Sequence, residues 1–178
     1  MNKTILYGLL VGCAALLLTT SCSFNRGAEI HTTPDIRYYS PITRHAADTL
    51  LIDTLLVKIV EDGYLLDTLQ VGDTAYFDLV FNTGYNNMQR VQITHDATCS
   101  KLHYFYRSQL DSIVLPSSNI DNGELLFEQG VMVFRMQLGY IATAPALNPK
   151  LVFTLESDSK YSPGRRTITT PIIPKRTE

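Results

Sequence analysis

The sequence predicts an all-β domain, built as an antiparallel, immunoglobulin-like β-sandwich of about seven strands. Residues 75–81 alternate strictly, with apolar side chains at every second position, which is typical of a half-buried strand. Similar segments follow, separated by turn residues about every 10–15 positions, and this spacing is typical of sandwiches. The chain has no tryptophan, so the cysteine–tryptophan pattern of antibody domains is missing. A closed β-barrel is the alternative.

The first half of the domain is expected to begin at Asp48. Residues 50–60 also fit a helix, because Leu51, Leu55 and Ile59 recur every four positions, but β-branched residues favour a strand. Further elements follow from turn residues and alternation. They are turns at 61–63 and 71–73, a strand with Ala75, Phe77, Leu79 and Phe81 on one face, a turn at 82–87, and a strand around Val91 and Ile93.

The longest strand of the second half is expected over residues 132–140. We expect its apolar stripe to lie in the core. The alternative is that the stripe lines a pocket for a hydrophobic ligand. That stripe comprises Met132, Phe134, Met136, Leu138 and Tyr140. The other elements are a strand over 101–107, a short helical or irregular crossing at 108–114, a loop at 116–123, strands over 125–127 and 151–156, a loop at 145–149, a turn at 157–164 and a last strand over 166–173.

The N-terminus has the layout of a secretory signal. Lys3 precedes an apolar run over residues 5–18, and small residues then lead to Cys22. This resembles a bacterial lipoprotein signal, in which the cysteine is acylated. The run is about 14 residues long, against about 20 for a transmembrane helix. Cleavage before Cys13, and cleavage without lipidation, are alternatives.

These features divide the chain into three parts: a lipoprotein signal peptide over residues 1–21, a flexible lipidated tether over 22–47, and the β-sandwich domain over 48–178. Gly27, Pro34 and Pro41 interrupt any periodicity in the tether. At its end, Tyr38-Tyr39 could pack against the domain. The sandwich is large enough to bury a core without metal or disulfide support.

Composition excludes some classes of function. The chain has 15 basic and 17 acidic residues and no basic stripe, so no nucleic-acid partner is expected. Cys13 leaves with the signal and Cys22 carries lipid, so Cys99 has no cysteine left to pair with. An unpaired thiol in an oxidising compartment is tolerated best when buried, and Cys99 is expected in the core.

The residues that could carry chemistry are few. His95 and His103, with Asp96 near, fall short of the three or four ligands of a zinc site, and they are expected to be partly exposed strand-end histidines. The sequence has no G-x-S-x-G motif and no evident serine partner for His95. We therefore predict no catalytic, cofactor-binding or metal-binding residue. The acids are expected to be solvated turn residues: Asp67, Asp73, Asp78, Asp121 and Glu124.

Two segments carry a resemblance to a known family. They are residues 67–74, DTLQVGDT, and residues 148–162, NPKLVFTLESDSKYS. The chain resembles a family of Bacteroidetes cell-envelope lipoproteins over residues 48–174. The resemblance implies an envelope lipoprotein with a β-sandwich and supplies no catalytic residues. Surface-exported lipoproteins of that phylum carry acidic residues after the cysteine, and residues 23–26 lack them, which favours an outer-membrane anchor facing the periplasm.

The functional expectation is a non-catalytic, membrane-anchored envelope lipoprotein. Its domain is expected to bind another envelope protein or a glycan through three loops, at residues 82–88, 116–123 and 143–149. One alternative is a carrier of a hydrophobic ligand in a barrel-like cavity. Another is a hydrolase that uses His95 or His103.

Overall fold

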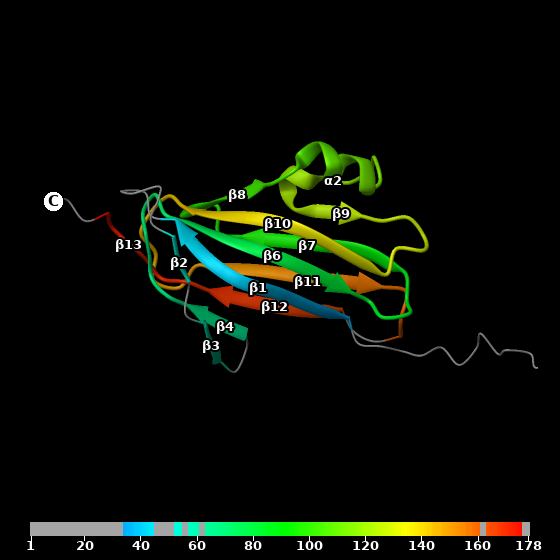
Figure 1. The fold of residues 1–178 in the computed structure, drawn as a ribbon, viewed down its shortest axis with the longest axis horizontal. Helices are drawn as coiled ribbons and strands as arrows, with labels where there is room; N and C mark the ends of the chain where they lie inside the picture. The colour runs from blue at the N-terminus through cyan, green and yellow to red at the C-terminus, as the bar shows by residue number, and fades with distance from the viewer. Residues whose placement is uncertain (1–33, 45–51, 55–56, 61–62, 161–162, 176–178) are drawn as a thin grey trace, which may run out of the picture. The chain divides into compact units, whose positions relative to one another are not determined.

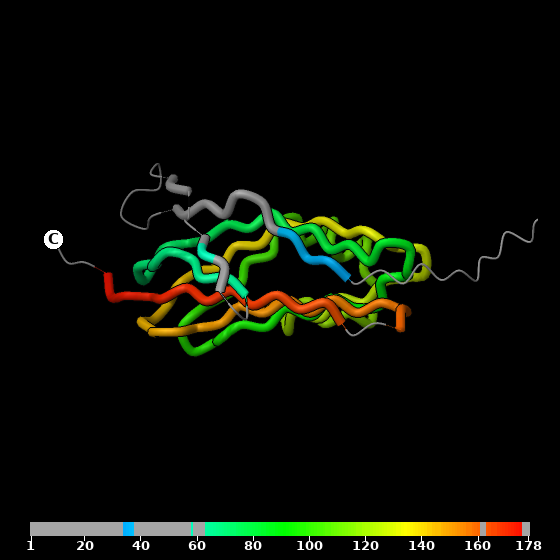
Figure 2. Tube along the Cα trace, turned by 90° about the horizontal axis from the view of Figure 1, so that it is seen from below, coloured from blue at the N-terminus to red at the C-terminus, as the bar shows by residue number. Residues whose placement is uncertain are grey.

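Two β-sheets packed face to face form the body of the domain (Figure 1). The computed structural model describes residues 34–44, 52–54, 57–60, 63–160 and 163–175, which belong to one compact unit, His31–Glu178. Figure 2 shows the two layers seen from their edge. The predicted signal peptide, with Cys13 and Cys22, lies outside the described residues.

The first sheet has five strands in the order β2-β1-β6-β10-β8. Their bounds are β1 Asp35–Arg44, β2 Ile52–Thr54, β6 Thr74–Asn82, β8 Ser100–Tyr104 and β10 Val133–Ala142. Both β1 and β10 pair with β6 in antiparallel fashion, so β6 is the centre of this sheet.

The second sheet has six strands in the order β3-β4-β12-β11-β7-β9. Their bounds are β3 Val57–Val60, β4 Gly63–Leu66, β7 Met88–His95, β9 Glu124–Leu126, β11 Lys150–Ser157 and β12 Gly164–Thr169. A third, two-stranded sheet pairs β5, Leu69–Gln70, with β13, Ile172–Ile173. Helix α2, Arg107–Ile113, and the 3-10 turn η1, Ile120–Asn122, connect β8 to β9.

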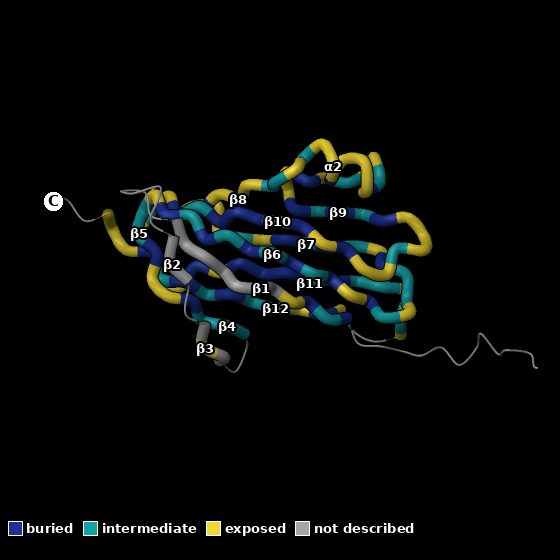
Figure 3. Tube along the Cα trace, viewed as in Figure 1, coloured by how far each residue is buried: buried dark blue, intermediate teal, exposed yellow. Residues whose placement is uncertain are grey.

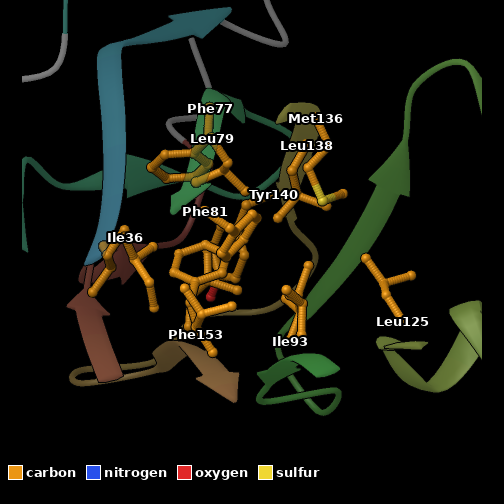
Figure 4. Packing of buried hydrophobic residues seen from close by; sticks show 14 of the residues in the cluster. Ile36, Phe77, Leu79, Phe81, Ile93, Leu125, Met136, Leu138, Tyr140 and Phe153 are labelled. Atoms are coloured by element: carbon orange, nitrogen blue, oxygen red, sulfur yellow. The ribbon is translucent and has the colours of Figure 1, made fainter. Parts of the chain in front are cut away.

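The core lies between the two large sheets (Figure 3). The predicted face of β6 is fully buried, with none of its four apolar side chains more than 2% exposed. Phe81 stacks on Phe134 of β10 and meets Phe153 of β11 edge-on, each with 6.2 Å between ring centroids. The contact between Phe81 and Phe153 joins the two layers (Figure 4). Burying each such side chain contributes about 1.5–3 kcal/mol.

The predicted all-β sandwich is confirmed, and the barrel is not formed because the two large sheets are not closed. Four residues of the predicted stripe, from Phe134 to Tyr140, are buried as expected. Met132 is not, because β10 begins one residue later and Met132 is 42% exposed. The prediction of a purely antiparallel sandwich of about seven strands was too simple, since β4–β12 and β5–β13 pair in parallel.

The domain begins earlier than the predicted boundary at Asp48. Residues assigned to the tether form β1, which pairs with β6 from Asp35 to Arg44. Pro41 obscured this strand in the sequence. It falls where the β1–β6 register shifts, between Tyr39 and Ile42, and a proline without a backbone N–H is tolerated at such a bulge.

Segment 50–60, predicted as one strand, contributes two. Strand β2 pairs with β1 in the first sheet, whereas β3 pairs with β4 in the second. Gly63, predicted to lie in a turn, opens β4, and a Cβ there would lie only 2.1 Å from Thr167 O. Glycine therefore permits the close approach of β4 to β12.

The chain turns sharply between β8 and α2. The predicted strand over residues 101–107 ends at Tyr104, and Tyr106 takes the left-handed conformation with φ 55°. The segment expected to be a short helical or irregular crossing, residues 108–114, is helical up to Ile113 and forms most of α2. Tyr106 therefore lies outside the strand, and its side chain is 64% exposed.

Gly123 fixes how the η1–β9 segment lies on β7. Its φ is +73°, and a Cβ there would lie 2.0 Å from Ile93 O. Ile93 N also donates a hydrogen bond of 2.8 Å to Gly123 O. An added methyl group would therefore push β9 away from β7.

We predict that Gly123→Ala destabilises the domain more than Gly130→Ala. Gly130 also has a positive φ, +97°, but nothing lies within 4 Å of its would-be Cβ. The Gly130 variant should therefore lose only the cost of backbone strain, about 1–3 kcal/mol. Urea unfolding of both variants measures the difference, and equal losses would show that Gly123 has no steric role.

Candidate functional site

A hollow of about 510 Å³ opens on the flank of the sandwich where β7 and β8 lie. We call it the flank hollow. The turn 96–99 crosses from the second sheet to the first at one side of it, and the α2–η1 segment contributes the other side. Its lining residues are His95, Ala97, Ser100, Lys101, Leu102, His103, Tyr104, Arg107 and Asp121.

His95 and Ser100 form a hydrogen-bonded pair at the two ends of the β7–β8 turn. His95 Nδ1 lies 2.9 Å from Ser100 Oγ, and Ser100 Oγ lies 2.7 Å from the backbone oxygen of Asp96. A carbonyl oxygen only accepts, so the single hydroxyl hydrogen of Ser100 must go to it. His95 Nδ1 must then carry a hydrogen and donate to Ser100, which leaves His95 Nε2 as an acceptor.

This hydrogen-bond direction is the reverse of what a serine nucleophile needs. A catalytic histidine accepts the serine proton, whereas here the histidine donates to the serine. Ser100 is also buried, with 1% of its surface exposed. The expectation that His95 lacks a serine partner was wrong, because Ser100 is its partner. Ser100 holds the turn together and is not arranged to act as a nucleophile.

The same turn explains Asp96 and Cys99. Hydrogen bonds from the side chain and backbone N–H of Thr98 lower the pKa of Asp96. Cys99 is buried as predicted, and burial raises the pKa of its thiol, which therefore stays protonated. The Cys99 carbonyl accepts hydrogen bonds from Thr143 and Ala144, so this residue ties the turn to the end of β10.

The other side of the hollow contains a buried hydroxyl without a partner. Among the described residues, Tyr104 Oη makes no hydrogen bond although it is shielded from solvent. Burial raises the pKa of Tyr104 to about 12. Nearby, Arg107 pairs with Asp121 at 2.9 Å and with Asp111 at 3.2 Å. An unsatisfied buried hydroxyl costs about 1–3 kcal/mol, and a ligand that bonds to it would recover part of this cost.

Tyr140 has the second such hydroxyl in the described part of the chain. It belongs to the core and does not line the flank hollow. Burial raises the pKa of Tyr140 to about 12, and nearby Ser100 opposes this rise.

The structure brings the two predicted histidines to the same hollow, from strands of different sheets. His103 meets Phe105 edge-on at 4.6 Å between ring centroids. Within the described ranges, no group of three or more histidine, cysteine or acidic side chains could hold a metal ion. Asp73, expected to be solvated, is 3% exposed and accepts a 2.8 Å hydrogen bond from Gln70 N.

The three predicted binding loops do not share one surface. Val133 of β10 pairs with Asn82, which begins the first loop, whereas Ala142 at the other end of β10 precedes the third. A ten-residue strand is about 33 Å long, so these two loops lie at opposite ends. The second loop, residues 116–123, contributes Asp121 to the flank hollow.

No family model and no curated protein matches the sequence. Among solved structures, the chain is similar to part of a family 123 glycoside hydrolase from Clostridium perfringens, whose structure was analysed for glycolipid glycan hydrolysis. The TM-score is 0.44 at 11% identity, and the match covers 81% of this chain and 28% of that chain. A likeness this distant carries no argument about activity, and the resemblance to envelope lipoproteins stays a prediction.

We predict that His95 makes the stability pH-dependent. Burial lowers the pKa of folded His95 below its usual 6.5, against the opposing charge of Asp96. As the pH falls, His95 therefore becomes protonated in the unfolded chain before it does in the folded chain. The stability that is present above about pH 6.5 is lost as the pH falls from there through the pKa of folded His95. Thermal unfolding between pH 7.5 and 5.5 should show this loss. It should shrink in His95→Gln and persist in His103→Gln, and an identical profile in both variants would contradict the assignment.

We predict that Ser100 is structural. Ser100→Ala leaves His95 Nδ1–H and the Asp96 carbonyl without their partner and should cost about 1–3 kcal/mol of stability. A fluorophosphonate probe should label no serine in the wild-type chain. Labelling that disappears in Ser100→Ala would show that this serine is a nucleophile.

Proposed function

We propose that this chain is a non-catalytic, lipid-anchored envelope protein that binds a glycan in the flank hollow. The observation that carries the binding role is the hydrogen-bond direction at His95 and Ser100. It leaves an open recess, lined by both polar and apolar groups, without an activated nucleophile. The anchoring role rests on the lipoprotein-like layout before Cys22. The proposed location is the outer membrane, facing the periplasm.

The polar groups of the hollow suit a ligand rich in hydroxyl groups. His95 Nε2 accepts, Lys101 donates, and Tyr104 Oη can do both. Sugar hydroxyls also donate and accept, so an oligosaccharide offers partners of both kinds for these groups. The volume of about 510 Å³ falls within the range of about 300–1,000 Å³ for ligand sites. Another envelope protein remains the second partner class, bound at the loops.

The carrier alternative has less support. A hydrophobic ligand needs an apolar space, and the region between the sheets is filled by large side chains such as Phe81, Tyr140 and Phe153.

None of the helices in the described ranges is both long and apolar enough to cross a bilayer. Membrane attachment in this proposal comes from acyl chains on Cys22, which hold firmly when two or more are present.

We predict that Tyr104→Phe weakens glycan binding without lowering stability. The change removes one hydroxyl that has no partner, so the free energy of unfolding should stay equal or rise. Loss of one hydrogen bond to the ligand should weaken binding about 2- to 10-fold. Full-length protein in detergent is screened against an array of neutral, amino and acidic oligosaccharides, and the best binder is then titrated by calorimetry.

Tyr140→Phe is the matched control for this experiment. It removes the other unpartnered hydroxyl, which lies in the core, and should leave binding unchanged. No binding to any oligosaccharide, or equal binding by wild type and Tyr104→Phe, would contradict the glycan site.

We predict that labelled palmitate enters the wild-type chain and Cys13→Ala but not Cys22→Ala. The apolar run preceding Cys22 is long enough for a signal peptide, whereas the run preceding Cys13 is shorter. Expression in a bacterial host with lipoprotein processing, followed by gel fluorography, measures this. Undiminished label in Cys22→Ala would remove the proposed anchor.

A further inference from the structure

The chain enters the sandwich at one defined end. Asp35, the first residue of β1, pairs with Asn82, the last residue of β6. The preceding residue, Pro34, lies against the start of β12, because a Cβ on Gly164 would meet Pro34 O at 2.4 Å. The β6–β7 loop is therefore beside the point of entry (Figure 1).

Three large apolar side chains are exposed at this end, and we call them the entry face: Tyr85 at 73%, Met132 at 42% and Val133 at 54%. Val133 pairs with Asn82, and Met132 O accepts hydrogen bonds from Thr83 N and Thr83 Oγ1, both at 2.9 Å. Tyr85 lies two residues further on, within the turn that Thr83 closes onto Asn86. The three residues therefore occupy adjacent backbone segments.

Asn87 holds this end of the sandwich together. Its side chain accepts from Gly130 N at 2.9 Å and donates to Asp158 Oδ2 at 2.6 Å, while its backbone N donates to Asp158 Oδ1 at 2.8 Å. Three connections, β6–β7, β9–β10 and β11–β12, are thereby joined. The acid at the entry point is also neutralised, because Asp35 pairs with Arg37 at 2.6 Å.

The covalent chain favours one end of the sandwich for the approach to a bilayer attached at Cys22. Twelve residues lie between Cys22 and Asp35. The thirteen residue-to-residue steps cover at most about 47 Å, since an extended chain spans at most about 3.6 Å per step. Placing the opposite end on the bilayer would require this linker to run back along about 33 Å of strand. The entry face is the end that the linker can bring to the surface without that detour.

We propose that the entry face rests on the lipid surface when Cys22 is acylated, with Tyr85 among the headgroups and Met132 and Val133 toward the acyl chains. This inference rests on the proposed lipid anchor. Tyrosine is enriched at membrane interfaces because its ring is apolar and its hydroxyl is polar. Weak contacts suffice, since the anchor keeps the domain at high local concentration.

This orientation leaves the flank hollow accessible. His95 pairs with Leu151, near the start of β11, whereas the entry face lies beside Ser157 and Asp158 at the other end of that strand. The His95 side of the hollow therefore points away from the bilayer. The exposed Leu147, at 85%, belongs to the same distant end.

The absence of tryptophan from the chain allows a clean test. Tyr85→Trp introduces a single fluorescent reporter on the entry face, and Leu147→Trp is the matched control at the opposite end. The full-length lipidated proteins are inserted into vesicles of phosphatidylethanolamine and phosphatidylglycerol with brominated acyl chains. Tyr85→Trp should show a blue shift and lose most of its emission, and Leu147→Trp should show neither. Val133→Trp replaces the first reporter if Tyr85→Trp does not fold.

The outcomes separate the two proposals. Equal quenching of both reporters, or none, in protein that floats with the vesicles would overturn the orientation and leave the lipid anchor standing. Flotation that is unchanged by Cys22→Ala, or absent from wild type, would overturn the anchor and the orientation together.

Discussion

The alternation of β6 is the constraint on which the rest of the domain depends. Ala75, Phe77, Leu79 and Phe81 all point into the core, and none is more than 2% exposed. A slip of one residue would turn all four into solvent and bring polar side chains inward. The pairing of β6 with β1 and with β10 is therefore fixed by burial. Phe81 stacks on Phe134 of the same sheet and joins this sheet to the second through its contact with Phe153.

The positions of the functional features follow from this register. Because Asp35 pairs with Asn82, the chain enters beside the β6–β7 loop. Because Ala142 pairs with Ser100, the β7–β8 turn lies at the opposite end of β10. The point where the described chain enters the sandwich and the His95 side of the flank hollow thus lie toward different ends of the domain, as the proposed anchoring and binding roles require. The flank hollow itself depends on the β7–β8 turn, which two hydrogen bonds hold: His95 Nδ1 donates to Ser100 Oγ, and Ser100 Oγ donates to the Asp96 carbonyl oxygen.

The sequence was sufficient wherever a strand was long and half-buried. The alternation over β6 and β10 predicted both their type and their buried faces, and the strand predicted over residues 151–156 is β11. Strands β2, β3, β4, β5 and β13 have two to four residues each, too few for a period to be seen, and β1 was hidden by Pro41. The His95–Ser100 bond could not be predicted from spacing alone, although Asp96 followed by Thr98 is a pattern that favours a tight turn after a strand. The burial of Asp73 depends on its bond to Gln70 within a turn that long-range packing covers.

The register of β1 on β6 is the claim from which the domain start, the entry face and the orientation all derive, and it can be measured directly by cross-linking. Arg37 lies opposite Val80, and directly opposite residues are about 4.5–5.5 Å apart between Cα atoms, within reach of a disulfide. The native Cys99 is buried and does not compete. Under mild oxidation, a chain with Arg37→Cys and Val80→Cys should form the cross-link, detected by peptide mass spectrometry. A chain with Arg37→Cys and Asp78→Cys, which lie on the same face but two residues out of register, should not. Cross-linking of the second pair but not the first would contradict the account.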